Sequence, residues 1–238
     1  MSKTYLKSDH FSGGGSALAA PHVLRAEHLS PFGCAWSGAS AEANGMYSSS
    51  GNPDLDRAVV ATLKNITQFL SINPGVKYIY DASPNAFAVP ESLVPDTQGT
   101  VLLGLNLINN ELFTSNYRGV AVAGICAHEC AHIFQFQSGY MQMFAGPTAA
   151  RMELHADYIA GMFLGQRDGT HSKGDVTDFA NTLFRHGDFQ FNDPGHHGTP
   201  LQRVMAMEAG YDVGRSRTKT MEGIHQGVDF LKRLEIQP

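Results

Sequence analysis

Residues 119–139 read GVAVAGICAHECAHIFQFQSG, an apolar run that contains the pattern His128-Glu129-x-x-His132. In a helix, positions four apart lie on the same face, so the two imidazoles can bind one divalent metal together. Glu129 lies about 100° around the helix from His128, at the edge of that face. It can therefore reach a water at the metal without being a ligand. The pattern predicts a zinc hydrolase centre, in which the metal lowers the pKa of water, Glu129 takes its proton, and the hydroxide attacks a carbonyl.

The two histidines need a third protein ligand, because a catalytic zinc site has three ligands and one open position. No further histidine follows at short spacing, but the next segment reads Glu153-Leu154-His155-Ala156-Asp157. In a helix Glu153 and Asp157 face the same way, whereas His155 points about 200° from Glu153. We expect Glu153 to complete a site for one Zn2+ per chain. We expect Asp157 to accept a hydrogen bond from a ligand imidazole and so set its tautomer.

The periodicity of the chain predicts an α+β fold, with a small antiparallel or mixed sheet followed by a mainly helical half that carries the metal site. The small residues Ala156, Ala160 and Gly161 predict that the Glu153 helix packs closely against the motif helix. The expected strands are 76–80, 86–89 and 100–105. The first expected helix begins at 53 and ends near 71–75, and the motif helix is capped by 114–116, ends at 138–139 and is followed by a loop. The further expected helices are 148–166, 175–186, 201–209 and 220–234.

Residues 1–52 differ from the rest in being rich in Gly, Ser and Ala with few regularly spaced apolar positions. This composition predicts a flexible or irregular N-terminal arm that packs partly through Phe32, Trp36 and Tyr47. The regular pattern starts at Asn52-Pro53-Asp54, so we place one domain at 53–238.

The net charge of −5 does not indicate a protein that binds nucleic acid, and no run of Lys or Arg indicates binding to an anionic membrane surface. The most apolar window, 120–127, is far shorter than the roughly 20 residues of a transmembrane helix. The N-terminus does not read as a secretory signal, so the expected location is cytoplasmic, or secreted or periplasmic only if a targeting segment was removed. The three cysteines, Cys34, Cys126 and Cys130, fit a reducing compartment, and we interpret the last two as small buried residues.

The combination of HECAH at 128–132 and ELHAD at 153–157 resembles the gluzincin metallopeptidases that have a Glu-x-x-x-Asp second motif. It is most similar to soluble relatives of the CAAX prenyl proteases and the heat-shock membrane proteases, and to predicted neutral zinc metallopeptidases. The likeness covers about residues 54–212 and extends to Asn85–Ala88, Gly99–Leu105 and the His197–Arg203 segment. The absence of membrane-spanning segments departs from the integral-membrane branch, so prenylated substrates are not supported.

The resemblance implies a zincin-like fold for the domain at 53–238, and a zinc-dependent endopeptidase that acts on a polypeptide. It implies zinc ligation by His128, His132 and Glu153, and catalysis by Glu129 as general base. His197 and Arg203 would stabilise the oxyanion, an effect worth roughly 3 kcal/mol for one well-placed donor. Substrate binding is implied for Asn85, Ala86, Phe87 and Ala88, in an edge strand that aligns an extended peptide by strand addition.

Several alternatives stay open. His197 can be a helix-start histidine and Arg203 a solvated arginine, while His196 is expected at the surface. The whole chain can be a zinc-stabilised binding or scaffold protein that has no catalytic activity, or a zinc hydrolase of a non-protein substrate. The oligomeric state does not follow from the sequence.

Overall fold

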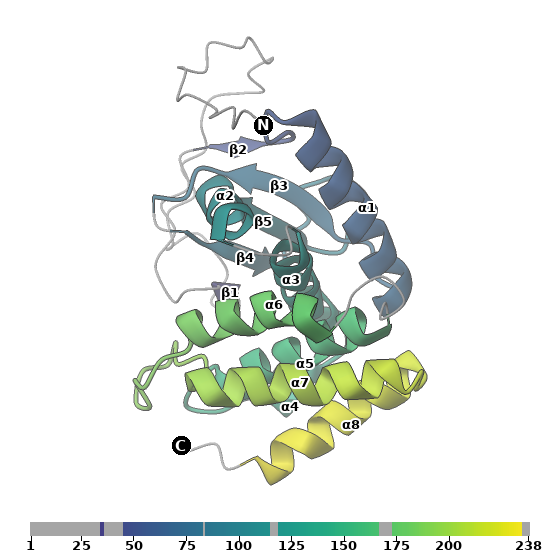
Figure 1. Ribbon diagram of the computed structural model, residues 1–238, viewed down its shortest axis with the longest axis vertical. Helices are drawn as coiled ribbons and strands as arrows, with labels where there is room; N and C mark the ends of the chain where they lie inside the picture. The colour runs from purple at the N-terminus through teal and green to yellow at the C-terminus, as the bar shows by residue number, and fades with distance from the viewer. Residues whose placement is uncertain (1–33, 36–44, 83, 115–118, 167–172, 235–238) are drawn as a thin grey trace.

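The structure is a computed structural model that describes residues 34–35, 45–82, 84–114, 119–166 and 173–234. It combines a five-stranded mixed sheet with eight described helices, which confirms the predicted α+β class. The sheet and the first helix occupy one part of the molecule and the C-terminal helices the other, with helix α3 between them (Figure 1).

The sheet has the strand order β1-β4-β5-β3-β2. Strand β3 pairs in parallel with β5, and the other three pairs are antiparallel. The predicted strands are confirmed to within one residue at each end. The strand bounds are Cys34–Ala35 for β1, Met46–Tyr47 for β2, Gly75–Ile79 for β3, Ala86–Val89 for β4 and Thr100–Gly104 for β5.

Strand β4 is not the edge of this sheet, which corrects one prediction. Its Phe87 and Ala88 pair with Ala35 and Cys34 of β1. The two outer strands, β1 and β2, both come from the segment predicted as an arm. Strand β2 pairs with β3 and sets Tyr47 opposite Tyr78. Pairing over long sequence separations leaves no local periodicity, so these two-residue strands were not predicted. Phe32 and Trp36 lie outside the described residues, and the domain boundary at residue 52 stays a prediction.

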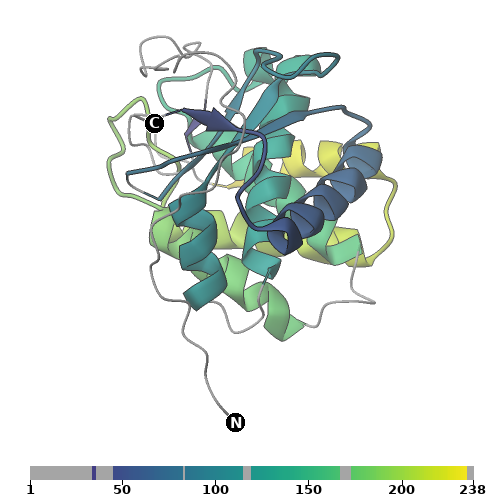
Figure 2. The ribbon, with the colours of Figure 1, turned by 90° about the horizontal axis from the view of Figure 1, so that it is seen from above.

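Helix α1, Pro53–Leu70, begins and ends as its sequence predicts. The Asn52 side chain accepts hydrogen bonds from the backbone N–H groups of Asp54 and Leu55, at 3.0 and 3.2 Å, and Pro53 occupies the first turn, where no intrahelical donor is needed. The helix ends at Ser71, which has a left-handed φ of 55°. Figures 1 and 2 show α1 alongside the strands.

Helix α2, Leu105–Thr114, follows β5 directly and was not predicted. Its first N–H groups are capped from a distance: the Asp81 carboxylate accepts from Asn106 N at 2.7 Å and from Leu107 N at 2.9 Å. Because the cap comes from 25 residues earlier in the chain, no local start signal marks this helix.

The motif helix α3, Val120–Gln137, lies at the centre of the fold and is buried on nearly every side. It contacts α1, α5, α6 and strands β4 and β5, so its sequence is apolar all round rather than amphipathic. Its N-cap is Gly119 and not the predicted residue 114, because Thr114 is the last residue of α2; the predicted capping residues 115 and 116 lie outside the described part of the chain. Cys126 and Cys130 are buried free thiols, which confirms their assignment to the core.

The C-terminal half is helical, and its helices α5 to α8 stack below the sheet in Figure 1. A one-turn helix, α4, replaces part of the predicted loop, and α7 runs six residues further than predicted. Among the described residues, no helix combines the length and apolar character needed to cross a bilayer. The bounds are Tyr140–Met143 for α4, Ala150–Gln166 for α5, Lys173–His186 for α6, Pro200–Arg215 for α7 and Thr220–Arg233 for α8.

Helices α5 and α7 approach so closely that their contact points require glycine. A Cβ at Gly161 would collide with the backbone carbonyl of Met207, and a Cβ at Gly210 would collide with that of Tyr158. The small residue Gly161, predicted to face the motif helix, therefore faces α7 instead. This contact places the buried polar side chains of α5 and α7 next to each other.

Candidate metal centre

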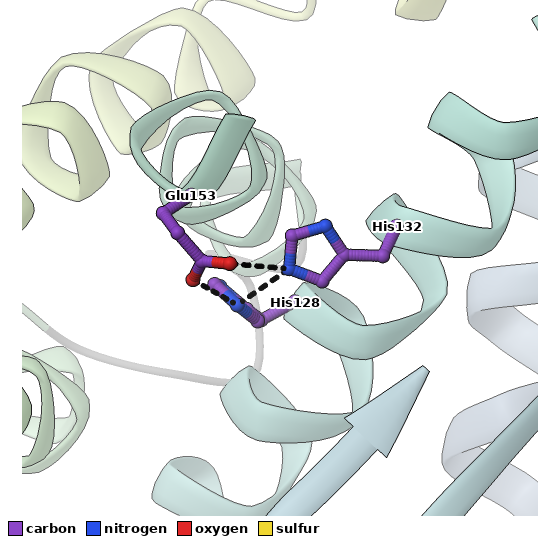
Figure 3. Close-up of side chains that lie close together, drawn as sticks. All are labelled: His128, His132 and Glu153. Carbon is purple, nitrogen blue, oxygen red and sulfur yellow. Dashed lines mark hydrogen bonds and ion pairs between the residues drawn. The ribbon is translucent and has the colours of Figure 1, made fainter. Parts of the chain in front are cut away.

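The side chains of His128, His132 and Glu153 converge in the interior, as Figure 3 shows. The two histidines project from α3 and the glutamate from α5, and all three are fully buried. The Nε2 atoms of the histidines are 3.0 Å apart. The carboxylate oxygens of Glu153 lie 3.3 Å from His128 Nε2 and 3.4 Å from His132 Nε2. The sequence prediction that these three residues form one group is confirmed.

These spacings suit a single metal ion. Bonds of about 2.0–2.1 Å in tetrahedral geometry place neighbouring ligand atoms about 3.3–3.4 Å apart. The three separations, 3.0 to 3.4 Å, lie near this value. One donor atom from each residue lies within 4.8 Å of the others, and among the described residues this is the only such group of three. The group can hold a metal ion, and the identity of the ion is a separate question.

Asp157 stands behind His128, as predicted from the helical spacing. Its Oδ1 lies 2.8 Å from His128 Nδ1, within hydrogen-bonding distance. An Nδ1–H donated to this carboxylate leaves Nε2 with its lone pair directed at the group of three. The expected role of Asp157 in setting the tautomer of a ligand histidine is therefore supported by position.

Arg203 holds Asp157 from the other side. Its Nε and Nη2 donate to the two carboxylate oxygens of Asp157 at 2.8 and 2.9 Å, and Nη2 lies 3.8 Å from Glu153. The alternative of a solvated arginine is wrong, because Arg203 has 0% of its surface exposed. This geometry favours a positioning role, because a guanidinium fully engaged with Asp157 is not aimed at a substrate carbonyl. Stabilisation of an oxyanion by Arg203 stays a prediction.

The start of α7 explains why Arg203 points inward. Thr199 and Gln202 form a capping box, in which the Thr199 hydroxyl accepts from Gln202 N at 3.2 Å and Gln202 Oε1 accepts from Thr199 N at 2.9 Å. Pro200 begins the helix. These local signals fix the helix start, so the fourth residue of α7 falls on its buried face.

His196 and His197 lie in the loop before α7, and both are buried. The expectation of a surface position for His196 is wrong, because its Nδ1 contacts the Asp188 carboxylate. The same carboxylate accepts from the backbone N–H of His197 at 3.1 Å. His197 is close enough to Glu153 to lower the pKa of that carboxyl. The structure therefore brings His197 near Glu153, one member of the group of three.

The charges of the group are strongly coupled. Burial by itself would lower the pKa of His128, but Asp157 and Glu153 outweigh it and raise that pKa to about 9. Burial lowers the pKa of His132 to about 4. Burial would raise the pKa of Glu153, yet the neighbouring histidines hold it well below its ordinary value. Glu153 is thus anionic in the folded chain, and His132 is a neutral imidazole.

Glu129 is the exceptional residue of the site. It is fully buried, and neither oxygen of its carboxylate has a hydrogen-bond partner among the described residues. Burial raises its pKa to about 8. A buried carboxyl without partners is costly for the fold, and such a group commonly marks a place where an ion or water belongs. Its surroundings fit a cation at the neighbouring group of three.

Two supporting residues were missed from the sequence. Gln135 was not singled out, although it lies three residues after His132 and therefore on the same helix face. His155 was assigned only a place beside the site. In the structure the Gln135 carboxamide lies between His132 and His155, at 2.7 and 3.2 Å. The helical spacing could have indicated Gln135, but its link to α5 depends on tertiary packing.

The predicted substrate-binding residues Asn85, Ala86, Phe87 and Ala88 are buried in and just before β4, a strand that contacts α3. They lie outside the group of ligating residues. The outer side of Phe87 and Ala88 carries β1, so strand addition at these two positions would have to displace a strand of the same chain. Substrate binding here stays a prediction.

The resemblance to gluzincin metallopeptidases rests on motifs within this sequence. The metal centre rests on the geometry of His128, His132 and Glu153 and on the buried carboxylate beside them. Neither of these two inferences depends on similarity to an individual known protein. Comparison with protein-family models, with curated proteins and with solved structures found no match for this chain.

Proposed function

We propose that this chain is a zinc-dependent endopeptidase with a zincin-like fold of the gluzincin type. One observation carries the proposal: two histidines and a glutamate converge at 3.0 to 3.4 Å, beside a buried Glu129 carboxylate that has no described hydrogen-bond partner. A structural zinc site needs four protein ligands and no free carboxylate, whereas a catalytic site has three ligands and a general base nearby.

The donor set favours zinc over harder cations. Two imidazole nitrogens and one carboxylate are ligands typical of zinc, while magnesium and calcium prefer oxygen donors. A bound zinc ion would supply Lewis-acid polarisation of a carbonyl and would lower the pKa of water. The chain itself supplies the three donors and holds the imidazoles of His128 and His132 through Asp157 and Gln135.

Glu129 would act as the general base. Its pKa of about 8 without a cation means that a nearby positive charge is needed to favour the carboxylate form at neutral pH. As a carboxylate it accepts a proton from the attacking water, and as a carboxylic acid it then donates that proton to the leaving amine. His197 stays the candidate for stabilising the oxyanion, because it is close enough to Glu153 to lower the pKa of that carboxyl.

The choice of a polypeptide as substrate rests on the resemblance to the gluzincin family. The site chemistry acts on a carbonyl and does not by itself select what is attached to it. A zinc hydrolase of a non-protein substrate therefore shares every residue assignment made above, and only the substrate differs.

A second candidate function has one observation in its favour. His128, Glu129, His132 and Glu153 all have 0% of their surface exposed, which fits a zinc-stabilised binding or scaffold protein with no access for substrate. Against this stands Glu129, because a purely structural site gains nothing from a buried carboxyl without a partner.

The substitution E129Q separates these possibilities. It should retain stoichiometric zinc and lose hydrolysis of casein or a peptide library by about 100-fold or more, because it removes a general base and keeps the ligands. E208Q, at an exposed position of α7, is the matched control and should cleave at the rate of the unsubstituted chain. Full activity in E129Q contradicts the mechanism. Bound zinc without any chelator-sensitive cleavage in the unsubstituted chain favours the scaffold.

A further inference from the structure

A line of buried polar side chains runs from His132 away from the metal centre, and the proposed mechanism does not use it. Its members are Gln135 on α3 and His155 on α5, both with 0% of their surface exposed. They link three helices, because the line ends at the backbone carbonyl of Ile224 on α8.

The contacts along this line are short and continuous. His132 Nδ1 lies 2.7 Å from Gln135 Oε1. The Gln135 Nε2 lies 2.9 Å from the carbonyl oxygen of Met152 and 3.2 Å from His155 Nδ1. The His155 Nε2 lies 3.3 Å from the carbonyl oxygen of Ile224.

Two backbone carbonyls determine the direction of every hydrogen bond in the line. A carbonyl oxygen only accepts, so Met152 O requires the NH2 group of Gln135 on its side, and Ile224 O requires a proton on His155 Nε2. In a neutral imidazole the other nitrogen, His155 Nδ1, then accepts from Gln135. The Gln135 Oε1 is left to face His132, where it can only accept from Nδ1–H.

We propose that Gln135, held by His155 and by the carbonyl of Met152, is a positioning residue that fixes His132 as the Nδ1–H tautomer and so directs the lone pair of Nε2 at the metal. This inference rests on the proposed metal centre and extends it to a residue that is not a ligand. In metal sites such outer partners orient the ligand imidazole and raise its basicity.

His155 is itself held in place by packing. Its ring stacks on Tyr140, with ring centroids 5.0 Å apart, and meets Phe144 at 4.8 Å. The ring therefore cannot turn to offer Gln135 a different nitrogen without disturbing α4 and the segment after it. Through the Ile224 carbonyl, the docking of α8 is coupled to the tautomer of a ligand on α3.

The first test measures zinc affinity by competition with a chromophoric chelator. Q135M keeps the length of the side chain and removes the amide, and it should raise the Kd for zinc by about 10- to 100-fold, the usual effect of losing such a partner. Q135E retains an acceptor for His132 Nδ1–H and should bind zinc more tightly than Q135M. The matched control is Q137M, which changes an exposed glutamine of the same helix and should leave the Kd unchanged.

The second test reads the tautomer directly in metal-free protein, by long-range 1H–15N correlation of the imidazoles. His132 should show a protonated Nδ1 and a bare Nε2 in the unsubstituted chain and in Q137M, and a mixture of tautomers in Q135M. H155F keeps the stacked ring and removes both of its hydrogen bonds. It should raise the Kd for zinc by less than Q135M does, because Met152 O still holds Gln135.

The outcomes are distinct. Failure of the unsubstituted chain to bind zinc contradicts the proposed function. Normal zinc binding by that chain, with an equal Kd and an unchanged His132 tautomer in Q135M, overturns the role of Gln135 alone. If Q135M does not fold, H155F decides, and a Kd and a His132 tautomer in H155F equal to those of the unsubstituted chain overturn the role.

Discussion

At the scale of single residues, the site depends on charges that are buried together. Arg203 is enclosed by protein and donates two hydrogen bonds to Asp157, which in turn contacts His128. Removing one member of such a buried pair leaves an uncompensated charge in the interior, which usually costs more than the pair itself contributes. The arginine therefore acts on the metal centre through Asp157.

The substitution R203M tests this role. It should lower the free energy of unfolding by about 3 to 5 kcal/mol, because the buried Asp157 loses both hydrogen bonds from Arg203 and keeps only His128 as a counter-charge. Urea denaturation of metal-free protein measures the change. R151M, at an exposed arginine of α5, should change stability little. If R203M is as stable as R151M, the hydrogen bonds between Arg203 and Asp157 do not contribute to stability.

Glu129 makes stability depend on pH. Its pKa rises from an ordinary value of 4.5 to about 8 in the folded chain, so the folded state binds this proton more tightly than the unfolded state does. The stabilisation is complete below pH 4.5 and is lost as the pH rises through about 8. In EDTA, the melting temperature of the unsubstituted chain should therefore fall relative to that of E129Q between pH 5 and pH 9. Parallel melting curves for the two proteins would contradict a buried, protonated Glu129.

At the scale of helices and strands, the close contact of α5 with α7 holds the two halves of the polar network together. Glu153 and Asp157 lie on α5, while Arg203 lies on α7. The helices approach at Gly161 and Gly210, where a side chain would meet the backbone of the facing helix. The distance between these helices therefore decides whether the guanidinium reaches both carboxylates.

Adding one methyl group at this contact should separate the helices. G161A should destabilise the protein by about 1 to 3 kcal/mol, as overpacking of a tight interior does, and should weaken zinc binding because Glu153 and Asp157 shift with α5. Thermal unfolding and the zinc Kd measure both effects. The control G146A adds the same methyl at an exposed position whose nearest neighbour lies 3.7 Å away. Equal stability of the two variants would contradict the close contact.

At the scale of the whole molecule, the candidate metal centre joins elements that are far apart in the sequence. The candidate ligands come from α3 and α5, and the supporting groups come from α7 and α8. A metal that binds only this assembled form stabilises the folded state as a whole.

Zinc should therefore raise the melting temperature in proportion to the logarithm of its concentration. At one hundred times its Kd, zinc adds about 2.7 kcal/mol, or about 5 to 10 °C for a chain of this size. Differential scanning calorimetry with and without a chelator measures the shift. H132A, which lacks one ligand, should lose most of it. A shift of equal size in H132A would place the zinc elsewhere on the chain.

Much of this architecture could be predicted because the signals are local. Helical periodicity placed His128 and His132 on one face with Glu129 at its edge, and the same spacing paired Glu153 with Asp157. The helical pattern also predicted the start of α1 and, to within one residue, the start of α7. The start of α2 and the pairing of β1 with β4 depend on residues distant in the sequence, so no local pattern predicted them.

The residues that can bind a metal were predictable from the sequence, because ligand type and helical spacing are properties of short segments. The way these residues are held depends on tertiary packing. Packing turned Arg203 toward Asp157 rather than toward solvent, buried the Glu129 carboxylate without a hydrogen-bond partner among the described residues, and set Gln135 against His155. These outcomes follow from the packing of α5 against α3, α7 and α8, and burial between helices depends on contacts that no single segment specifies.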